Sequence, residues 1–317
     1  MRDPGVFVTV RSVRLRTRLP APSIWSFLNS FEEESMKTPP ARAEFSGIVA
    51  SMEEKKFNGM SYRVNAILPE RRTLLFIHGL SGSLSAWYSY EEAFSKDFNM
   101  ITVDLLGHGL SDRPRELENY APNASAERIA ALIDALGVRD VVLVSHSYGT
   151  IVALELVRLH AARFAGAIFM AAVYHIKTQR LAWLMRIIVP CLAFVLTPFP
   201  AVGHDRRTDY SRFVPAPDWS LRRFVNDVKN MGIRSYFFSF RHVYMRDWDS
   251  EWLKLKLPTL FLHGSHDSFV SVNSVRELSN HLTGSRLLVI KGGNHILPLN
   301  NVPEMTSAIR EFAVALT

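Results

Sequence analysis

Ser147 is the residue of this chain whose surroundings best suit it to nucleophilic chemistry. The run Ser145-His-Ser147-Tyr-Gly149 follows the apolar stretch 141–144 and precedes the helix-like stretch 150–157. A strand, a sharp turn and a helix in that order raise a serine hydroxyl above the edge of a sheet. Backbone crowds such a turn, so small residues are needed two positions before and after the serine. Gly149 meets this need, and Ser145 meets it although glycine is more usual there.

A serine hydroxyl is a weak nucleophile, so a base must take its proton and an acid must orient that base. Asp267 and His295 follow Ser147 in the chain, and each stands just beyond an apolar, strand-like stretch. Sites of open parallel sheets form at the carboxyl ends of the strands. We therefore predict that Ser147 attacks a carbonyl, that His295 carries its proton to the leaving group, and that Asp267 orients His295. Asp249 and Asp227 are weaker alternatives for the acid.

Two further motifs lie at the ends of earlier strand-like stretches. One is Phe76-Ile-His78-Gly79-Leu80, and the other is Asp104-Leu-Leu-Gly107-His-Gly109-Leu-Ser111. Together with the serine turn and the chain order Ser–Asp–His, they resemble the α/β-hydrolase fold superfamily over residues 57–317. Within it, the chain looks like the cap-bearing serine esterases and the monoacylglycerol-lipase-like enzymes.

This resemblance implies roles for residues beside the three that would do the chemistry. The backbone N–H groups of Leu80 and Tyr148 would form the oxyanion hole, which stabilises the charge of a tetrahedral intermediate. His78, Gly79 and Gly149 would support the site, with His78 packed behind the oxyanion loop or, alternatively, in contact with substrate. Asp104 and His108 would brace loops.

The fold class that we predict is α/β, with a mostly parallel central sheet and helices on both faces. Strand-like stretches alternate with stretches of helical periodicity, which is typical of parallel sheets covered on both sides. The expected strands are 57–67, 72–78, 98–105, 141–144, 164–172, 258–263 and 286–290, and the expected helices are 86–96, 124–136, 148–160, 270–282 and 302–316.

The alternation breaks between residues 174 and 256, where we predict an inserted, mainly helical cap. Residues 46–173 and 257–317 would then form the core, and residues 1–45 a disordered or non-core extension. The stretch 187–202 is almost wholly apolar but has 16 residues and three prolines. A spanning helix needs about 20 apolar residues. The stretch therefore suits the lining of an acyl pocket, a membrane interface or ordinary cap core.

The distribution of charge along the chain indicates which kinds of partner it could bind. The formal net charge of +7 arises mainly within residues 175–256, which hold 14 basic and seven acidic groups. Such a field suits an anionic lipid surface or substrate, and we expect no nucleic-acid partner.

Cys191 is the single cysteine, so no internal disulfide can form. With no signal-peptide pattern, we expect a cytoplasmic location with peripheral membrane contact through the cap. No pattern for a metal or another cofactor is seen.

The predicted activity is that of a serine hydrolase that cleaves a carboxylic ester, with a lipid or a medium or long acyl chain as the favoured substrate. Resemblance to haloalkane dehalogenases and soluble epoxide hydrolases is weaker, because those enzymes have Asp where this chain has Ser147. Two alternatives stay open. The chain could cleave a carbon–carbon or another acyl bond with the same triad, or it could be a non-catalytic ligand-binding protein of the same fold.

Overall fold

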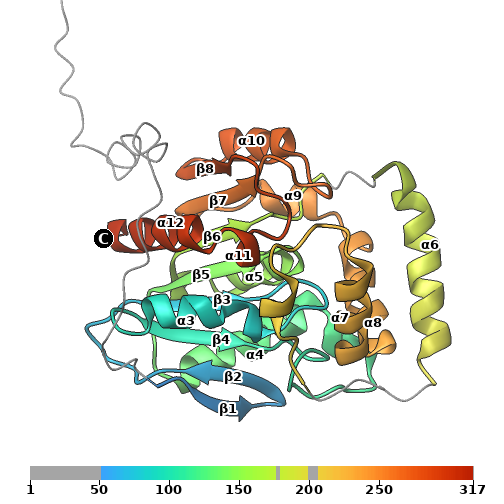
Figure 1. The fold of residues 1–317 in the computed structure, drawn as a ribbon, viewed down its shortest axis with the longest axis horizontal. Coiled ribbons are helices and arrows are strands. Elements are labelled where there is room, and N and C mark those ends of the chain that lie inside the picture. The colour runs from blue at the N-terminus through green and yellow to red at the C-terminus, as the bar shows by residue number, and fades with distance from the viewer. Residues whose placement is uncertain (1–50, 176–178, 199–205, 317) are drawn as a thin grey trace, which may run out of the picture. The chain divides into compact units, whose positions relative to one another are not determined.

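The computed structural model describes residues 51–175, 179–198 and 206–316 (Figure 1), so the expectation for residues 1–45 lies outside the described residues. The described residues all belong to one compact unit. Its centre is an eight-stranded sheet with the order β1-β2-β4-β3-β5-β6-β7-β8. The strands are β1 (Glu53–Phe57), β2 (Met60–Val64), β3 (Thr73–Ile77), β4 (Asn99–Val103), β5 (Val141–His146), β6 (Phe164–Met170), β7 (Thr259–Gly264) and β8 (Ser285–Ile290).

The sheet is mostly parallel, as the sequence predicts. The pairs from β4 to β8 are parallel, whereas β2 is antiparallel to both β1 and β4. Strands β3 and β4 are buried along their whole length, which explains why most of their residues are apolar. Because the strands from β4 to β8 in the sheet order run parallel, their carboxyl ends meet at one edge. The predicted site residues lie at this edge, where they follow β3, β5, β7 and β8.

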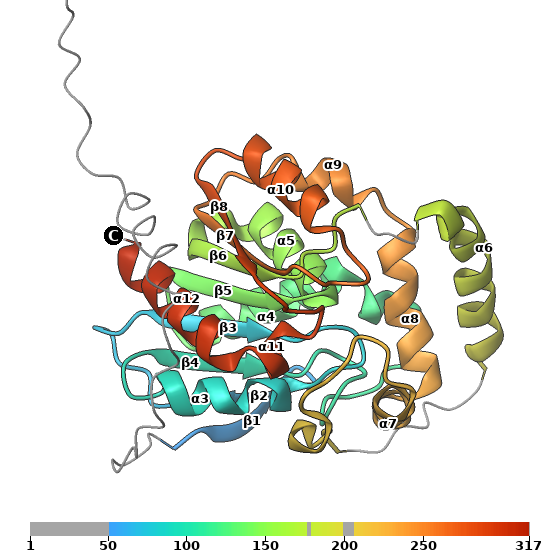
Figure 2. The same ribbon diagram turned by 45° about the horizontal axis from the view of Figure 1, so that its top comes forward.

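The helices of the core cover both faces of this sheet (Figures 1 and 2). Helices α4, α5 and α10 pack on one face, and α3 and α12 pack on the other. The core helices and short helical turns are η1 (Leu84–Trp87), α3 (Tyr88–Phe94), η2 (Leu117–Tyr120), α4 (Pro122–Ala135), α5 (Tyr148–His160), η3 (Ala161–Arg163), α10 (Val272–His281), α11 (Leu297–Asn300) and α12 (Val302–Ala315).

The first expected strand is wrong in its bounds. In place of one strand over 57–67, the chain forms a hairpin in which β1 and β2 pair in antiparallel register around Asn58 and Gly59. Both turn residues have positive φ, 46° and 78°. Asn-Gly is the dipeptide that two-residue hairpin turns of this kind prefer, because both residues tolerate that backbone region.

The insertion between β6 and β7 is mainly helical in its described residues. It comprises α6 (Gln179–Leu196), η4 (Tyr210–Phe213), α7 (Leu221–Met231), α8 (Ile233–Tyr244) and α9 (Trp248–Trp252). Helix α6 lies beside α8 at the edge of the molecule (Figures 1 and 2). Pro190 lies within α6. Among the helices of the described ranges, none has both the length and the apolarity that crossing a bilayer requires.

Candidate active site

The turn that carries Ser147 connects β5 directly to α5. Ser147 has φ 49° and ψ −120°, a region that non-glycine residues rarely occupy and that costs free energy. Its own N–H donates to the Met170 carbonyl at 3.0 Å, which holds the strained turn in place. A Cβ added to Gly149 would lie 2.5 Å from the His78 carbonyl oxygen. Only glycine fits at that position, so the sequence requirement for a small residue has a direct steric cause.

Ser147, His295 and Asp267 are brought together from the ends of three strands. His295 Nε2 lies 2.9 Å from Ser147 Oγ, and His295 Nδ1 lies 2.8 Å from Asp267 Oδ2. The other carboxylate oxygen of Asp267 accepts the backbone N–H groups of Phe269 and Val270, at 2.7 and 2.9 Å. The arrangement can transfer a proton from the serine hydroxyl to an imidazole whose orientation is fixed.

The electrostatics of the buried acid favour its ionised form. Burial alone raises the pKa of Asp267, but the hydrogen bond from His295, the electrostatic interaction with that ring and the backbone N–H of Val270 together lower it to about 2. The two weaker candidates for the acid are engaged elsewhere. Asp249 accepts the backbone N–H of His175, and Asp227 accepts the hydroxyl of Thr208.

The predicted oxyanion loop packs directly against the serine turn. A Cβ on Gly79 would lie 2.9 Å from His146 Nδ1 and 3.2 Å from Ser147 Cβ, so glycine allows this close approach. Leu80 and Tyr148 both line the same cavity as Ser147. Their placement is compatible with donation from both backbone N–H groups to an oxyanion, and that role stays a prediction.

His78 is held by the backbone rather than directed by a charged partner. Its Nε2 accepts the Leu105 N–H at 3.0 Å, so Nδ1 carries the proton and donates to the Gly79 carbonyl at 2.8 Å. Burial lowers the pKa of His78, which keeps the ring neutral. These contacts favour the interpretation that His78 braces the oxyanion loop.

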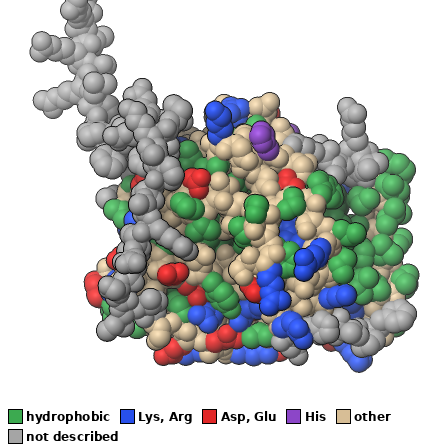
Figure 3. Space-filling model, viewed as in Figure 1, with side chains coloured by type: hydrophobic (Ala, Val, Ile, Leu, Met, Phe, Trp, Pro, Cys, Tyr) green, Lys and Arg blue, Asp and Glu red, His purple; other side chains and the backbone are tan. Residues whose placement is uncertain are grey.

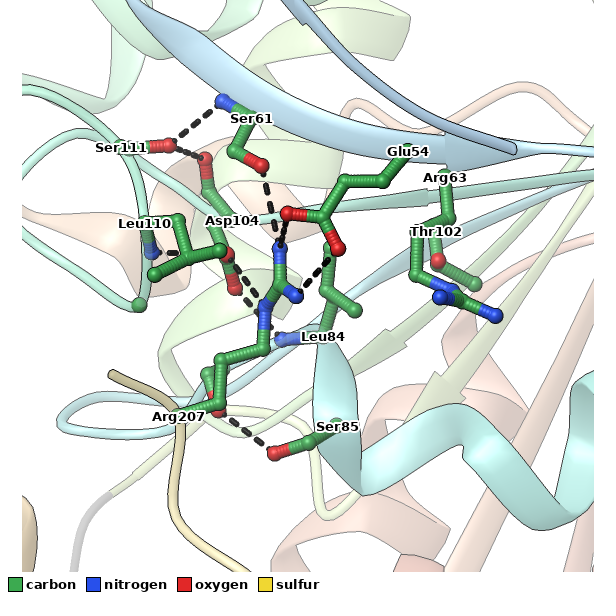
Figure 4. A network of polar contacts seen from close by, with 12 residues as sticks. Glu54, Ser61, Arg63, Leu84, Ser85, Thr102, Asp104, Leu110, Ser111 and Arg207 are labelled. Carbon is green, nitrogen blue, oxygen red and sulfur yellow. Dashed lines mark hydrogen bonds and ion pairs between the residues drawn. The ribbon is translucent and has the colours of Figure 1, made fainter. Parts of the chain in front are cut away.

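Asp104 braces the neighbouring loops through the network in Figure 4. Its side chain is fully buried and accepts the N–H groups of Leu84 and Leu110, at 2.7 and 3.1 Å. Arg207, which belongs to the insertion, donates Nε to Asp104 at 2.8 Å and also pairs with Glu54 at 2.8 Å. Arg207 thus fastens the insertion to the loop after β4.

A cavity of about 730 Å³ adjoins the triad. The core contributes Ser147 and His295 to its wall, and the insertion contributes mainly aromatic and apolar side chains, among them Trp219, Phe224, Tyr236 and Phe240. Burial raises the pKa of Asp227, also in this wall, to about 7, against the lowering effect of its Thr208 hydrogen bond. The cavity therefore suits a predominantly apolar ligand.

The sequence does not predict some of the contacts that hold His295. Asp218 accepts the backbone N–H of His295 at 2.7 Å, yet it lies in a proline-rich stretch that reads as an ordinary loop. His146 donates Nε2–H to the His295 carbonyl at 2.8 Å, and burial together with the electrostatic interaction with His295 lowers the pKa of His146 to about 3. In the ranges described, no group of three or more His, Cys, Asp or Glu residues is placed to hold a metal ion.

A Ser–His–Asp arrangement at the carboxyl edge of a mostly parallel sheet defines a hydrolase-type site. Comparison with known proteins agrees with this class, since a sequence model described as "alpha/beta hydrolase fold" matches residues 72–302. The chain belongs to the alpha/beta hydrolase fold family.

The relatives and solved structures that resemble the chain are distant. The mouse "Protein ABHD8" is 24% identical over 254 residues, which are 75% of this chain and 54% of that protein. The chain thus spans about half the length of that relative. "Epoxide hydrolase 3" of Xenopus tropicalis is 24% identical over 290 residues, covering 81% of this chain and 76% of that protein.

Solved structures share the fold at lower identity. An enol-lactonase from Burkholderia xenovorans has a TM-score of 0.63 and 20% identity, covering 83% of this chain and all of that one. An esterase from Rhodococcus has a TM-score of 0.61 and 23% identity, covering 84% of this chain and all of that one. At these identities the likeness to the solved structures shows a shared fold.

Proposed function

We propose that this protein is a serine hydrolase that cleaves carboxylic esters through an acyl-enzyme intermediate. The observation that carries the proposal is the continuous hydrogen-bonded series from Ser147 Oγ to His295 and from His295 to Asp267, at 2.9 and 2.8 Å. Nucleophile, base and orienting acid are the three groups that acyl transfer to a serine needs.

The first half of the proposed reaction uses this geometry. Ser147 Oγ attacks the carbonyl carbon while His295 Nε2 takes its proton, and Asp267 stabilises the resulting imidazolium. The N–H groups of Leu80 and Tyr148 stabilise the tetrahedral oxyanion, which preorganised donors can do by several kcal/mol. The intermediate then collapses, the carbon–oxygen bond to the alcohol breaks, and His295 returns the proton to the departing alkoxide oxygen.

The second half repeats the same steps with water. His295 takes a proton from a water molecule, whose oxygen attacks the acyl carbonyl, and the proton is returned to Ser147 Oγ as the acid leaves. The apolar wall of the cavity supports an acyl group of medium or long chain, because burying each methylene contributes about 0.8 kcal/mol.

The experiment is hydrolysis of p-nitrophenyl esters across acyl lengths, together with labelling by a fluorophosphonate probe. The wild type should hydrolyse esters and be labelled, whereas Ser147→Ala should lose both properties. Ser307→Ala is the matched control, because Ser307 lies on α12 and bonds to Glu311. Labelling of Ser147 without hydrolysis of any ester would contradict ester specificity and favour carbon–carbon or other acyl cleavage. Absence of both in the wild type would favour a ligand-binding protein.

We also propose that α6 contacts anionic membranes. Its exposed apolar side chains form a face at the edge of the molecule, where Figure 3 shows hydrophobic side chains gathered. Phe194 is 81% exposed and Trp183 is 64% exposed. Exposed apolar groups of this size suit an anionic lipid surface, because residues 175–256, which include α6, hold 14 basic and seven acidic groups.

Flotation with lipid vesicles tests this contact. The wild type should float with phosphatidylserine-containing vesicles more than with neutral ones, and Phe194→Ser should reduce binding. Val314→Ser is the control, because Val314 is a 69% exposed apolar residue outside the insertion. Equal binding to both vesicle types, or equal binding by Phe194→Ser and the wild type, would refute the proposal.

A further inference from the structure

The segment 216–219, which leads from η4 into α7, lies against the loops that carry the acid and the base of the triad. Asp218 Oδ1 accepts the N–H of His295 at 2.7 Å. Asp218 Oδ2 accepts the N–H of Ser268, the residue after Asp267, at 2.9 Å. One carboxylate from the insertion therefore binds both loops at once.

The two hydrogen bonds to Asp218 fix the distance between the acid loop and the base loop as well as their positions. The separation of the two carboxylate oxygens is set by covalent geometry, so the N–H groups of Ser268 and His295 cannot move apart without breaking a bond. Backbone N–H to carboxylate bonds are charge-assisted and stronger than neutral ones. The triad bond between Asp267 and His295 spans the same two loops, and Asp218 therefore reinforces the spacing on which that bond depends.

The backbone of His295 is held on both sides. Asp218 accepts its N–H, and His146 donates Nε2–H to its carbonyl at 2.8 Å. Since His146 directly precedes Ser147, the base is tied to the serine turn through one peptide group and to the acid loop through the other. The imidazole can rotate only about its own side-chain bonds, because its backbone is fixed.

Other contacts keep the segment itself in place. The Ala216 carbonyl accepts the side-chain amides of Asn294 and Asn300, both at 2.8 Å, and the Ala216 N–H donates to Asn300 at 2.7 Å. The Trp219 ring lies 4.7 Å from that of Phe269, which lies 4.8 Å from the His295 ring. These contacts give Asp218 a defined approach to both N–H groups.

We infer that Asp218 is a positioning residue of the triad, supplied by the insertion, that sets the place of His295 relative to Asp267. The inference rests on the proposed serine-hydrolase function. It requires a carboxylate, because two N–H donors need two acceptor oxygens. Asparagine offers one oxygen and turns an NH₂ group toward the second donor, so it conserves the shape of Asp218 but breaks the contact.

Loss of the contact should act on the chemical step rather than on binding. A small misplacement of a catalytic group can lower the rate about 10²-fold. We therefore expect Asp218→Asn and Asp218→Ala to lower kcat for an ester by about that factor with a smaller change in KM, because acyl transfer loses its geometry while the aromatic and apolar side chains that line the cavity are kept. Asp218→Glu should be more active than Asp218→Asn, since it retains both oxygens.

The test measures kcat, KM and the rate of fluorophosphonate labelling of Ser147 in these variants, with thermal unfolding to compare stabilities. Asp209→Asn is the matched control. Asp209 also accepts a backbone N–H, that of Ser211 at 3.2 Å, but it does so within its own exposed turn. The control should label at the wild-type rate. Labelling of Asp218→Asn at the wild-type rate, or greater activity of Asp218→Asn than of Asp218→Glu, would overturn the inference.

Hydrogen exchange separates this inference from the proposed function. If Asp218 clamps the two loops, Asp218→Asn should speed amide exchange in peptides that contain Ser268 and His295, and Asp209→Asn should not. Unchanged exchange in both peptides would overturn the inference even in an active enzyme. A wild type that is neither labelled nor active would overturn the proposed function, whereas the exchange result would still decide whether the clamp exists.

Discussion

Replacement of Arg207 by methionine tests how firmly the insertion is fastened to the core. The Arg207 side chain is 9% exposed and Asp104 is fully buried, so the change leaves a buried carboxylate without its cation. Breaking a buried pair in this way costs about 3–5 kcal/mol. Asp104 keeps two backbone donors, from Leu84 and Leu110, which places the expected loss near the lower end, at about 3 kcal/mol.

The second partner of Arg207 adds little to this estimate. Glu54 is 36% exposed, and pairs screened by solvent contribute about 0–1 kcal/mol. Burial alone lowers the pKa of Arg207, but its bonds to Glu54 and Asp104 together raise it, so the guanidinium stays charged. The expected total corresponds to a fall in Tm of roughly 6–12 °C.

Urea unfolding and calorimetry measure this loss. Arg163→Met is the control, because Arg163 pairs with Asp134 at 2.8 Å on the surface, where the side chains are 34% and 57% exposed. The control should lose no more than about 1 kcal/mol. If Arg207→Met loses no more than Arg163→Met, the network in Figure 4 does not anchor the insertion and the reasoning fails.

Three further results are expected. Asp267→Asn should lower kcat for an ester about 10⁴-fold, because asparagine selects the wrong imidazole tautomer, and a loss below about tenfold would contradict its role as the acid. Asp227, whose pKa is raised to about 7, contributes to the stability of the folded state below pH 4, and this contribution is lost as pH rises through 7. In the wild type, the unfolding free energy measured in urea should therefore fall by about 4 kcal/mol between pH 4 and pH 8 because of this group. Asp227→Asn should lack that fall. Gly149→Ala should abolish labelling of Ser147, because the added Cβ meets the Ile77 carbonyl oxygen at 2.7 Å; retained labelling would show that the turn can relax.

The sequence predicts the parts of this site that are built from local patterns. Ser147 could be found because a strand, a tight turn and a helix surround it within a dozen residues, and the structure places β5 and α5 there. Asp267 and His295 could be found because each follows an apolar strand whose carboxyl end must reach the same edge of a parallel sheet. The mostly parallel sheet follows from the same apolar runs.

The parts that the sequence does not predict depend on contacts between distant residues. Asp218 lies 77 positions from His295, and Arg207 lies 103 positions from Asp104. Neither residue belongs to a periodic pattern, because each contacts a segment distant in the sequence through its single side chain. The β1–β2 hairpin was missed for a different reason: its polar first strand, which is largely exposed, has no apolar alternation to mark it.

The segment that contains Arg207 and Asp218 and the helix α6 are two parts of the insertion with different proposed roles. Arg207 binds the loop after β4, and Asp218 binds the loops after β7 and β8, so the segment 207–219 bridges loops at the ends of three strands. Substitution of Arg207 should therefore alter the stability of the core, and substitution of Asp218 should alter the triad. Helix α6 packs on α8 and presents Phe194 outward, so substitutions on that face should change membrane binding and leave the chemistry of Ser147 intact. Measuring labelling rate and vesicle binding in one set of variants would test this separation, since a Phe194 variant that lost labelling would show that the two roles are coupled.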